Sequence, residues 1–168
     1  MSYQQHIKSA DQIVARCAIV TISDTRSAST DGSGQRIAEM LQEAGHKKVS
    51  YKIVPDDAAK LGPVLDELIA SAEVDVVLSN GGTGISRRDV TIPVIEERLD
   101  SSLPGFGEIF RMLSYEQIGS GAILSRAVAG VTRGKVLFAM PGSTKAVELA
   151  MSKLILPEIK HLLFELRK

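Results

Sequence analysis

The sequence predicts an α/β fold with a central, mostly parallel β-sheet flanked by helices. Apolar runs typical of buried strands alternate with segments of helical periodicity, and polar or glycine-rich loops follow four of the predicted strands. Alternating strands and helices produce parallel strands joined by helical crossovers. The 168 residues contain no internal repeat and no second linker, so we expect a loosely held, flexible arm over residues 1–15 and one domain over residues 16–168.

The first half of the predicted domain contains three strands, each followed by a helix. A continuous apolar run ending in polar turn residues, which is typical of a strand covered on both faces, occupies residues 16–23. The second and third strands are predicted at residues 49–54 and 74–80. Gly45 suits the end of the first helix, Pro55 stops the second strand, and Pro63 is expected in the first turn of the second helix. The apolar faces of the three helices are predicted at Ile37, Met40, Leu41 and Ala44; at Leu61, Leu65, Leu68, Ile69 and Ala72; and at Val94, Ile95 and Leu99.

The second half of the chain is predicted to add a helix, two strands and two closing helices. Residues 105–119 have a helical pattern, and residues 125–142 contain two apolar runs joined at Arg133 and Gly134. The last helix shows an apolar face with the spacing of an amphipathic helix. This face is formed by Ile159, Leu162, Leu163 and Leu166.

Charge, cysteine and histidine content exclude several classes of function. The 20 Lys and Arg residues balance 20 Asp and Glu residues, which argues against a general nucleic-acid binder. Cys17 is the single cysteine and is expected to be a small core residue, whereas His6, His46 and His161 lack metal-ligand spacing and are expected at the surface. The N-terminal residues do not resemble a secretory signal, and no apolar run approaches the ~18 residues of a membrane span. We therefore expect a cytoplasmic protein that does not enter a membrane.

Polar loops follow four of the predicted strands. These loops are ISDTRS (residues 22–27), VPDD (54–57), SNGGTGISRRD (79–89) and AMPGSTK (139–145). In open α/β sheets, ligands bind beyond the carboxyl ends of the strands. We therefore expect the four loops to form a binding site at one edge of the sheet.

The third loop combines glycines, two arginines and an aspartate. Successive glycines let backbone N–H groups converge on a phosphate, and the N-terminus of the following helix adds a favourable dipole. Asp89 repels phosphate and is compatible with it only if a divalent cation lies between them. The alternative is a tight turn capped by Asp89 or Thr91. The loop matches neither the Walker A motif nor a dinucleotide-binding fingerprint.

Acidic residues in the neighbouring loops extend this hypothesis. One of Asp56 and Asp57 is expected to cap a helix, and the other can face the same cleft as Asp89, where two carboxylates can hold Mg²⁺ against a triphosphate. Asp24 can either form hydrogen bonds within its loop or contact a ligand, and the sequence does not distinguish these two roles. Residues 142–145 form either another phosphate-binding loop or a capped helix start.

Five segments in order resemble the MoaB/Mog family of molybdenum cofactor biosynthesis. They are VTISDTRS (residues 20–27), VPDD (54–57), GGTGISRRDVT (81–91), PGFGEIFRMLSYEQIGSGAILSRAVAG (104–130) and FAMPGSTKAVELAM (138–151). The similarity extends from residue 16 to the C-terminus, and FRMLSYEQIG with SRAVAG is more similar to the MoaB branch. The resemblance implies a three-layer, molybdopterin-binding-like α/β domain that assembles as a trimer or hexamer. Other molybdenum cofactor enzymes are possible partners.

The same resemblance implies an activity and a set of site residues. The implied reaction converts molybdopterin and ATP, with Mg²⁺, into adenylyl-molybdopterin and pyrophosphate. Asp56 and Asp89 correspond to essential aspartates of the family, and we expect them to be catalytic and to hold Mg²⁺. The residues predicted to bind substrate or nucleotide are Ser23, Asp24, Gly81, Gly82, Thr83, Gly84, Arg87, Arg88, Pro141, Gly142, Ser143 and Lys145.

The chemistry of that reaction agrees with the residues present. A terminal phosphate nucleophile is already ionised near neutral pH, so no general base is required and no catalytic histidine is expected. The reaction needs charge neutralisation and alignment of two phosphate-bearing substrates. Two alternatives remain open: a non-catalytic molybdopterin-binding or assembly module, and a nucleotide-binding α/β protein of other specificity.

Overall fold

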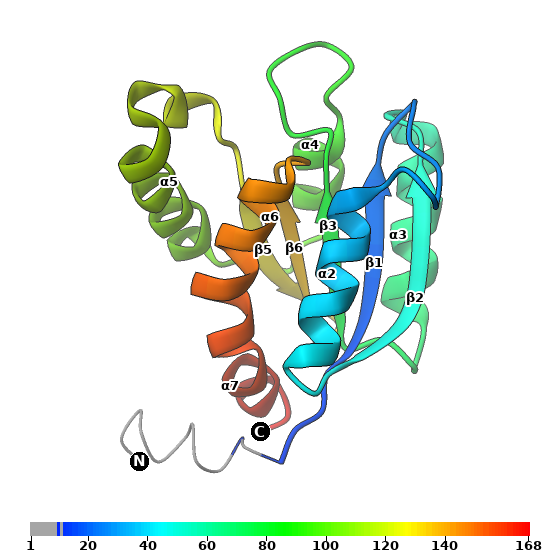
Figure 1. The fold of residues 1–168 in the computed structure, drawn as a ribbon. Coiled ribbons are helices and arrows are strands. Elements are labelled where there is room, and N and C mark those ends of the chain that lie inside the picture. The colour runs from blue at the N-terminus through cyan, green and yellow to red at the C-terminus, as the bar shows by residue number, and fades with distance from the viewer. Residues whose placement is uncertain (1–9, 11) are drawn as a thin grey trace.

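The computed structural model describes residue 10 and residues 12–168, and it confirms the α/β fold (Figure 1). The six-stranded sheet has the order β2-β1-β3-β6-β5-β4. The first four strands of this order are mutually parallel, whereas β5 is antiparallel to β6 and β4 is antiparallel to β5. The strands are β1 (Arg16–Ile22), β2 (Lys47–Val54), β3 (Val76–Asn80), β4 (Ser101–Ser102), β5 (Val128–Thr132) and β6 (Lys135–Met140).

Helices cover both faces of the sheet and produce the expected three layers (Figure 1). Helices α2, α5, α6 and α7 contribute to one apolar core, and α3 and α4 contribute to the core on the opposite face. The α-helices are α2 (Gly32–Glu43), α3 (Ala58–Ala70), α4 (Thr91–Glu96), α5 (Pro104–Ile118), α6 (Thr144–Ala150) and α7 (Leu156–Leu166). A 3₁₀ helix, η1 (Gly119–Leu124), follows α5, and a π-helical segment, η2 (Met151–Ile155), joins α6 to α7.

Strand β1 shows why an apolar run without alternation forms a central strand. Cys17 and Ile19 face the core beneath α2 and α7, whereas Ala18 and Val20 face the core beneath α3. Both faces are buried, as the sequence predicted. Burial raises the pKa of the Cys17 thiol to about 12, so this residue is an inert part of the core.

The prediction that Pro63 lies in the first turn of a helix is wrong. Helix α3 begins at Ala58, because the Asp57 carboxylate accepts a hydrogen bond from the Ala59 backbone N–H at 2.8 Å. Pro63 therefore lies inside the helix, where its missing N–H removes one backbone hydrogen bond. The helix also ends at Ala70, before Ala72 of the predicted apolar face.

The prediction that the histidines lie at the surface is wrong for His46. This side chain is buried, and its Nδ1 accepts a hydrogen bond from the Ala15 backbone N–H at 3.2 Å. Burial lowers the pKa of His46, which favours the neutral ring that can accept this bond. His161 is half-buried on α7 beside Glu158, and His6 lies outside the described residues.

The arm predicted for residues 1–15 falls mainly on residues 1–9 and 11, which lie outside the described residues. Ala15, the last residue of that range, is buried, and its carbonyl oxygen accepts a hydrogen bond from the Lys47 N–H. Among the described residues, no helix is both long enough and apolar enough to cross a membrane.

Candidate functional site

The four polar loops contact one another at the carboxyl edge of the parallel strands. Asp24, after β1, accepts a hydrogen bond from the Asp56 backbone N–H at 3.1 Å, and Asp56, after β2, accepts one from Val90 at 3.2 Å. The loop after β6 lies against the loop after β3, since a Cβ on Gly142 would come within 3.0 Å of the Gly81 Cα. The structure thus brings together at one edge segments separated by more than 100 residues.

The first two glycines of the loop after β3 occupy positions that a larger residue cannot. Gly81 and Gly82 have φ angles of +93° and +61°. A Cβ on Gly81 would lie 2.3 Å from the Ile22 carbonyl oxygen, and a Cβ on Gly82 would lie 2.3 Å from the Thr91 hydroxyl and 2.8 Å from an Asp56 carboxylate oxygen. Thr91 also donates its hydroxyl hydrogen to the Gly81 carbonyl oxygen at 2.9 Å. The loop therefore depends on both glycines for its shape.

Asp89 belongs to the glycine loop rather than to the helix after it. Its carboxylate accepts a hydrogen bond from the Ser86 backbone N–H at 2.9 Å, and hydrogen bonds from Ser86 and Gly84 lower its pKa. Helix α4 begins only at Thr91, has six residues, and receives no side-chain cap. Neither Asp89 nor Thr91 caps α4, so the alternative of a simple capped turn does not describe this segment.

The structure resolves the roles of the adjacent aspartates Asp56 and Asp57. Asp57 caps α3, whereas Asp56 faces the glycine loop through its bond to Val90. Burial raises the pKa of Asp56, and the nearby charges of Asp89 and Asp24 raise it further. Three carboxylates therefore repel one another in this region, and a bound cation would relieve that repulsion.

The donor set fits a shared Mg²⁺ rather than an all-protein metal cage. Within residues 10 and 12–168, no three His, Cys, Asp or Glu side chains are grouped so as to hold a metal ion. Mg²⁺ is commonly held by one or two carboxylates together with substrate phosphates and water. Asp56 and Asp89, which interact electrostatically, match this requirement.

The arginines and the first loop form one ion pair. Arg88 pairs through Nη2 with the Asp24 carboxylate. Asp24 thus makes contacts that form the loop, and its predicted contact with a ligand stays a prediction, while Arg87 is exposed. Ser23 also stabilises its own loop, because its hydroxyl oxygen accepts hydrogen bonds from the Thr25 and Arg26 backbone N–H groups at 3.2 Å.

The loop after β6 is a capped helix start. The Ser143 side chain accepts a hydrogen bond from the Ala146 N–H at 3.2 Å and caps α6. The Gly142 carbonyl oxygen accepts hydrogen bonds from Arg26 at 2.9 Å and from the Ser33 hydroxyl at 2.7 Å. Thr83 is buried, Pro141 is half-buried and Lys145 is exposed beside this loop, and their contacts with a ligand remain predictions.

Arg126, which lies between η1 and β5, was not among the predicted site residues. Its guanidinium donates a hydrogen bond to the Thr83 carbonyl oxygen at 2.9 Å and another to the Gly84 carbonyl oxygen. These bonds fix the carbonyl groups of the last two residues of the GGTG segment. The only sequence signal was its place in the SRAVAG segment, because 43 residues separate it from Thr83.

A second unpredicted feature is a buried polar network beneath the loops. The Asp31 side chain is fully buried and accepts hydrogen bonds from the Tyr51 hydroxyl at 2.6 Å, the Gly34 N–H at 3.0 Å and Arg26 at 3.2 Å. Burial opposes ionisation of Asp31, but its hydrogen bonds prevail and lower its pKa. The position of Asp31 one residue before the glycine-rich start of α2 was the available signal, since aspartate is a preferred helix cap.

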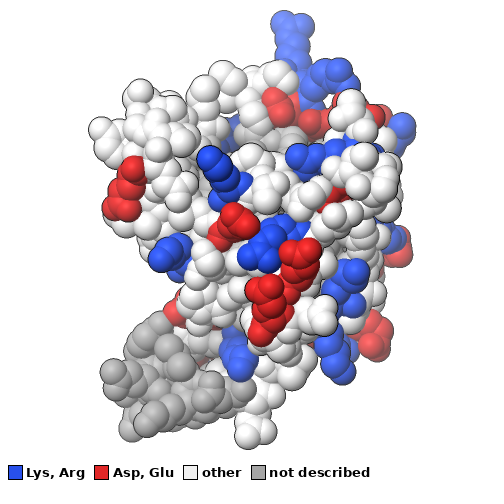
Figure 2. All heavy atoms as spheres, viewed as in Figure 1, with Lys and Arg blue, Asp and Glu red and all other residues white. Residues whose placement is uncertain are grey.

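Charged side chains of both signs gather around the loop end of the molecule. Figure 2 shows Lys and Arg side chains beside Asp and Glu side chains at the end where Figure 1 places the loop after β3. The ion pair between Arg88 and Asp24 is one example of this mixing. Such a surface can compensate a phosphate while also supplying oxygen ligands for a cation.

Comparison with known proteins identifies the family to which this chain belongs. A family model described as a probable molybdopterin binding domain matches residues 18–161. The whole chain is 55% identical to molybdenum cofactor biosynthesis protein B of Bacillus cereus and 51% identical to the protein of that name from Bacillus subtilis, and covers 99% of each.

Solved structures agree with the sequence comparison. One crystal structure of a molybdenum cofactor biosynthesis protein B is 56% identical with a TM-score of 0.90, covering 92% of this chain and 97% of the other. The tungsten cofactor synthesizing protein MoaB from Pyrococcus furiosus is 39% identical with a TM-score of 0.81, covering 92% and 98% of the two chains.

Proposed function

Because the chain belongs to the molybdopterin-binding domain family of molybdenum cofactor biosynthesis proteins, within the MoaB group, we propose that it adenylylates molybdopterin. In this reaction a terminal phosphate oxygen of molybdopterin attacks the α-phosphorus of ATP. A new P–O bond forms, the bond to the β-phosphate bridging oxygen breaks, and pyrophosphate leaves with the electron pair. The participation of the family in molybdenum cofactor biosynthesis is established by the comparisons, and the adenylyl transfer is our proposal.

The observation that carries the proposal is the placement of two carboxylates against the glycine loop: a Cβ on Gly82 would lie 2.8 Å from an Asp56 oxygen, and a Cβ on Gly84 would lie 2.6 Å from an Asp89 oxygen. A binding site for phosphates alone has no use for two carboxylates, because like charges repel. With a divalent cation the same carboxylates become useful, and Mg²⁺ held there would neutralise charge on the phosphates. Burial raises the pKa of Asp56 most, and the charges of Asp89 and Asp24 raise it further; a cation bound there would offset the repulsion between these charges.

The remaining residues of the site orient the substrates. Among the described residues, the Gly81 N–H donates to the Met140 carbonyl oxygen and the Gly84 N–H bonds to Asp89, which leaves the Gly82 and Thr83 N–H groups for phosphate oxygens. Tight packing of the loop against Ile22 and Thr91 fixes its shape. Arg87 and Lys145 are exposed at this edge and can compensate phosphate charge. Because the nucleophile needs no deprotonation, the chain's own contribution is alignment and electrostatics.

Pyrophosphate release from molybdopterin and Mg-ATP tests the proposal. Asp89→Ala and Asp56→Ala should each lower the rate by about 100-fold or more, since a metal-holding carboxylate is worth several kcal/mol of barrier. Asp57→Ala is the matched control, because Asp57 caps α3 and does not face the glycine loop. An inert wild type, or near-normal activity of Asp89→Ala, would show that the assigned chemistry is wrong.

One observation favours a second candidate, a non-catalytic molybdopterin-binding module. Asp89 and Arg88 are both engaged in contacts within the protein, with Ser86 and Asp24 respectively. If these contacts persist when substrates are present, neither side chain acts on ATP. Calorimetry separates the candidates, because the module would bind molybdopterin but not Mg-ATP.

We also propose that the protein forms a homo-oligomer. Helix α5 and the adjoining η1 carry a run of exposed apolar side chains, and contiguous exposed apolar surface is typical of interaction sites. Sedimentation equilibrium should give a trimer or a hexamer, and a monomer at micromolar concentration would exclude this assembly. The side chains concerned are Ile109, Met112, Tyr115, Ile118, Ile123 and Leu124.

A further inference from the structure

The start of helix α4 is bonded to the glycine loop. Thr91, the first residue of α4, donates its backbone N–H to the Gly82 carbonyl oxygen at 3.0 Å and its hydroxyl hydrogen to the Gly81 carbonyl oxygen at 2.9 Å. The helix has six residues, and isolated helices of that length are not stable in water. The position of the loop therefore depends on the tertiary contacts that hold α4.

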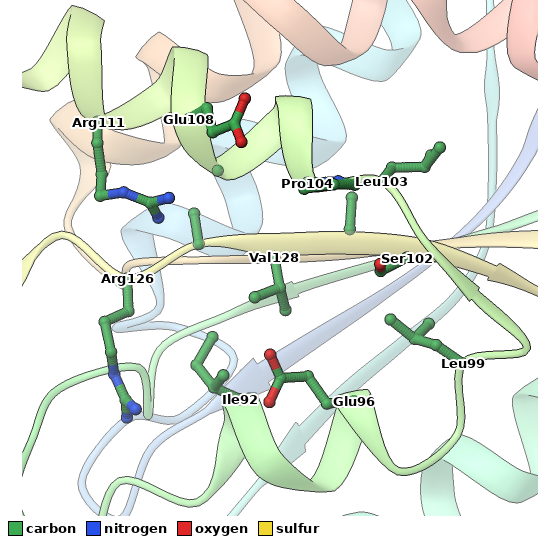
Figure 3. Close-up of a pocket in the computed structure, with 13 residues that line it drawn as sticks. Ile92, Glu96, Leu99, Ser102, Leu103, Pro104, Glu108, Arg111, Arg126 and Val128 are labelled. Atoms are coloured by element: carbon green, nitrogen blue, oxygen red, sulfur yellow. The ribbon is translucent and has the colours of Figure 1, made fainter.

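The two sides of α4 are packed differently. On one side, Val94 and Ile95 share an apolar core with Leu61 and Leu65 of α3. On the other side, Glu96 borders an open hollow of about 450 Å³ between α4, β5 and α5 (Figure 3). Apolar contacts are non-directional, so they do not by themselves fix a short helix along its axis. A directional contact between α3 and α4 is needed for that.

Arg98, two residues after the end of α4, supplies this directional contact. Its Nε donates to one carboxylate oxygen of Asp66 on α3 at 2.7 Å, and its Nη2 donates to the other at 3.1 Å. Such two-point pairing fixes direction as well as distance. Its Nη1 donates to the Val94 carbonyl oxygen at 2.8 Å, near the C-terminal end of α4. We call these three hydrogen bonds the Arg98 clasp.

Helix α3 has a glycine where the guanidinium of Arg98 contacts it. The three atoms nearest to a Cβ added at Gly62 would all belong to this guanidinium, the first at 2.7 Å. Glycine inside a helix lowers its stability, and Pro63 directly follows within α3. The helix thus contains an unfavourable residue at the position where a methyl group would displace the clasp.

A continuous path of hydrogen bonds leads from the clasp to the candidate site. Arg98 bonds to the Val94 carbonyl oxygen, and the Val94 N–H donates to the Val90 carbonyl oxygen at 3.2 Å. The Val90 N–H in turn donates to the Asp56 carboxylate at 3.2 Å. We propose that Arg98 is a positioning residue, and that its clasp acts through α4 to set the glycine loop and the direction of the Asp56 carboxylate. The inference rests on the proposed function, which assigns this loop to the nucleotide.

Hydrogen exchange of the ligand-free full chain, read by mass spectrometry, tests the clasp without any substrate. Arg98→Ala should raise the exchange rate of residues 81–95 by about 10-fold or more, because charge-assisted hydrogen bonds that hold this segment are lost, while β1 exchanges as in the wild type. Asp66→Ala should have the same effect. Lys52→Ala is the matched control, since it removes an ion pair with Glu67 at the next position of α3 and should leave residues 81–95 unchanged.

Gly62→Ala separates positioning from stability. Alanine favours the helix more than glycine does, whereas its methyl group displaces the guanidinium. This variant should exchange faster over residues 81–95 without a lower free energy of unfolding in urea, a combination that a purely structural role of Arg98 does not produce.

Calorimetric titration with Mg-ATP measures the effect on the site. Arg98→Ala should bind Mg-ATP roughly 5- to 20-fold more weakly than the wild type. The double variant with Asp66→Ala should bind no more weakly than Arg98→Ala alone, because the two residues act as one unit. Additive losses would overturn the inference.

The exchange experiment distinguishes failure of the clasp from failure of the proposed function. Unchanged exchange over residues 81–95 in Arg98→Ala, an equal rise in β1, or the same rise in Lys52→Ala would overturn the inference even if the wild type is active. If Arg98→Ala does not fold, unchanged exchange in Gly62→Ala and Asp66→Ala would overturn it. A rise confined to residues 81–95 in a protein that releases no pyrophosphate would support the clasp and refute the adenylyl transfer.

Discussion

Substitution of Gly82 by alanine tests whether the glycine loop is as tightly built as its geometry indicates. Gly82 has φ +61°, and an added Cβ would lie 2.3 Å from the Thr91 hydroxyl and 2.8 Å from an Asp56 oxygen. Gly45 provides a matched control, because it has φ +77° and nothing within 4 Å of an added Cβ. The two positions share the backbone requirement and differ only in the space around the new methyl group.

The two substitutions should therefore differ in free energy of unfolding by the steric contribution alone. Placing an L-residue in the left-handed region lowers the free energy of unfolding by about 1–2 kcal/mol, and this loss applies to both variants. Overpacking of a close-packed site costs a further ~1–3 kcal/mol, which applies to Gly82→Ala only. Thr91 is buried and bonded to Gly81, so it cannot move aside without loss of that bond. We expect totals of about 1–2 kcal/mol for Gly45→Ala and about 2–5 kcal/mol for Gly82→Ala.

Urea unfolding followed by circular dichroism measures both values. The variants should be compared at one protein concentration, because an oligomer gains stability with concentration. Calorimetric titration with Mg-ATP adds a functional measurement, in which Gly82→Ala should bind at least about tenfold more weakly, since about 1.4 kcal/mol corresponds to a factor of ten. Gly45→Ala should bind as the wild type does.

Equal destabilisation by the two substitutions would refute the steric argument. It would mean that Thr91 and Asp56 move aside at no cost and that the loop is not tightly packed. Equal Mg-ATP affinity of the two variants, with Gly82→Ala folded, would refute the assignment of this loop to the nucleotide.

Three further predictions concern other parts of the site. Asp57→Ala should lower the free energy of unfolding by about 1 kcal/mol through loss of the α3 cap, while pyrophosphate release is retained. Asp31→Asn should lower the free energy of unfolding at neutral pH, as measured by urea unfolding. Because the pKa of Asp31 is lower in the folded protein than in the unfolded chain, its ionised carboxylate stabilises the fold at pH values above the unfolded pKa. This stabilisation is lost as the pH falls, so the difference from wild type should shrink below about pH 4. Arg126→Ala should lower kcat/KM for pyrophosphate release by roughly 10- to 100-fold, because two charge-assisted hydrogen bonds are lost. Arg126→Lys should have an intermediate effect. Unchanged kinetics of Arg126→Ala would show that Arg126 does not position the loop.

The sequence predicted those parts of the fold that depend on local patterns. Apolar runs identified β1 and β3, because a strand buried on both faces needs apolar residues without alternation. The parallel topology then placed the four loops at one edge. The pair Asp56 and Asp57 was correctly divided into one helix cap and one residue facing the loop, although only the structure shows that Asp57 is the cap.

The features that the sequence did not predict depend on contacts between distant segments. Arg126 and Thr83 are 43 residues apart, and no local pattern links an arginine to a carbonyl oxygen. His46 is buried and accepts a hydrogen bond from the Ala15 backbone N–H, 31 residues earlier in the chain, which is a tertiary contact. Pro63 was placed in a first turn by propensity, whereas the Asp57 cap fixed an earlier helix start. Tertiary contacts override local preference in each case.

The contacts that build the site also couple ligand supply to the lifetime of the folded chain. The hydrogen bonds from Asp56 to Asp24, from Arg126 to Thr83 and from Arg26 to Gly142 span 32, 43 and 116 residues. No fragment of the chain can form these loops alone, so a ligand binds only the complete fold. A ligand at 100 times its Kd then adds about 2.7 kcal/mol to the free energy of unfolding. Depletion of the ligand would therefore remove this contribution and raise the fraction of unfolded chain that a protease can cleave.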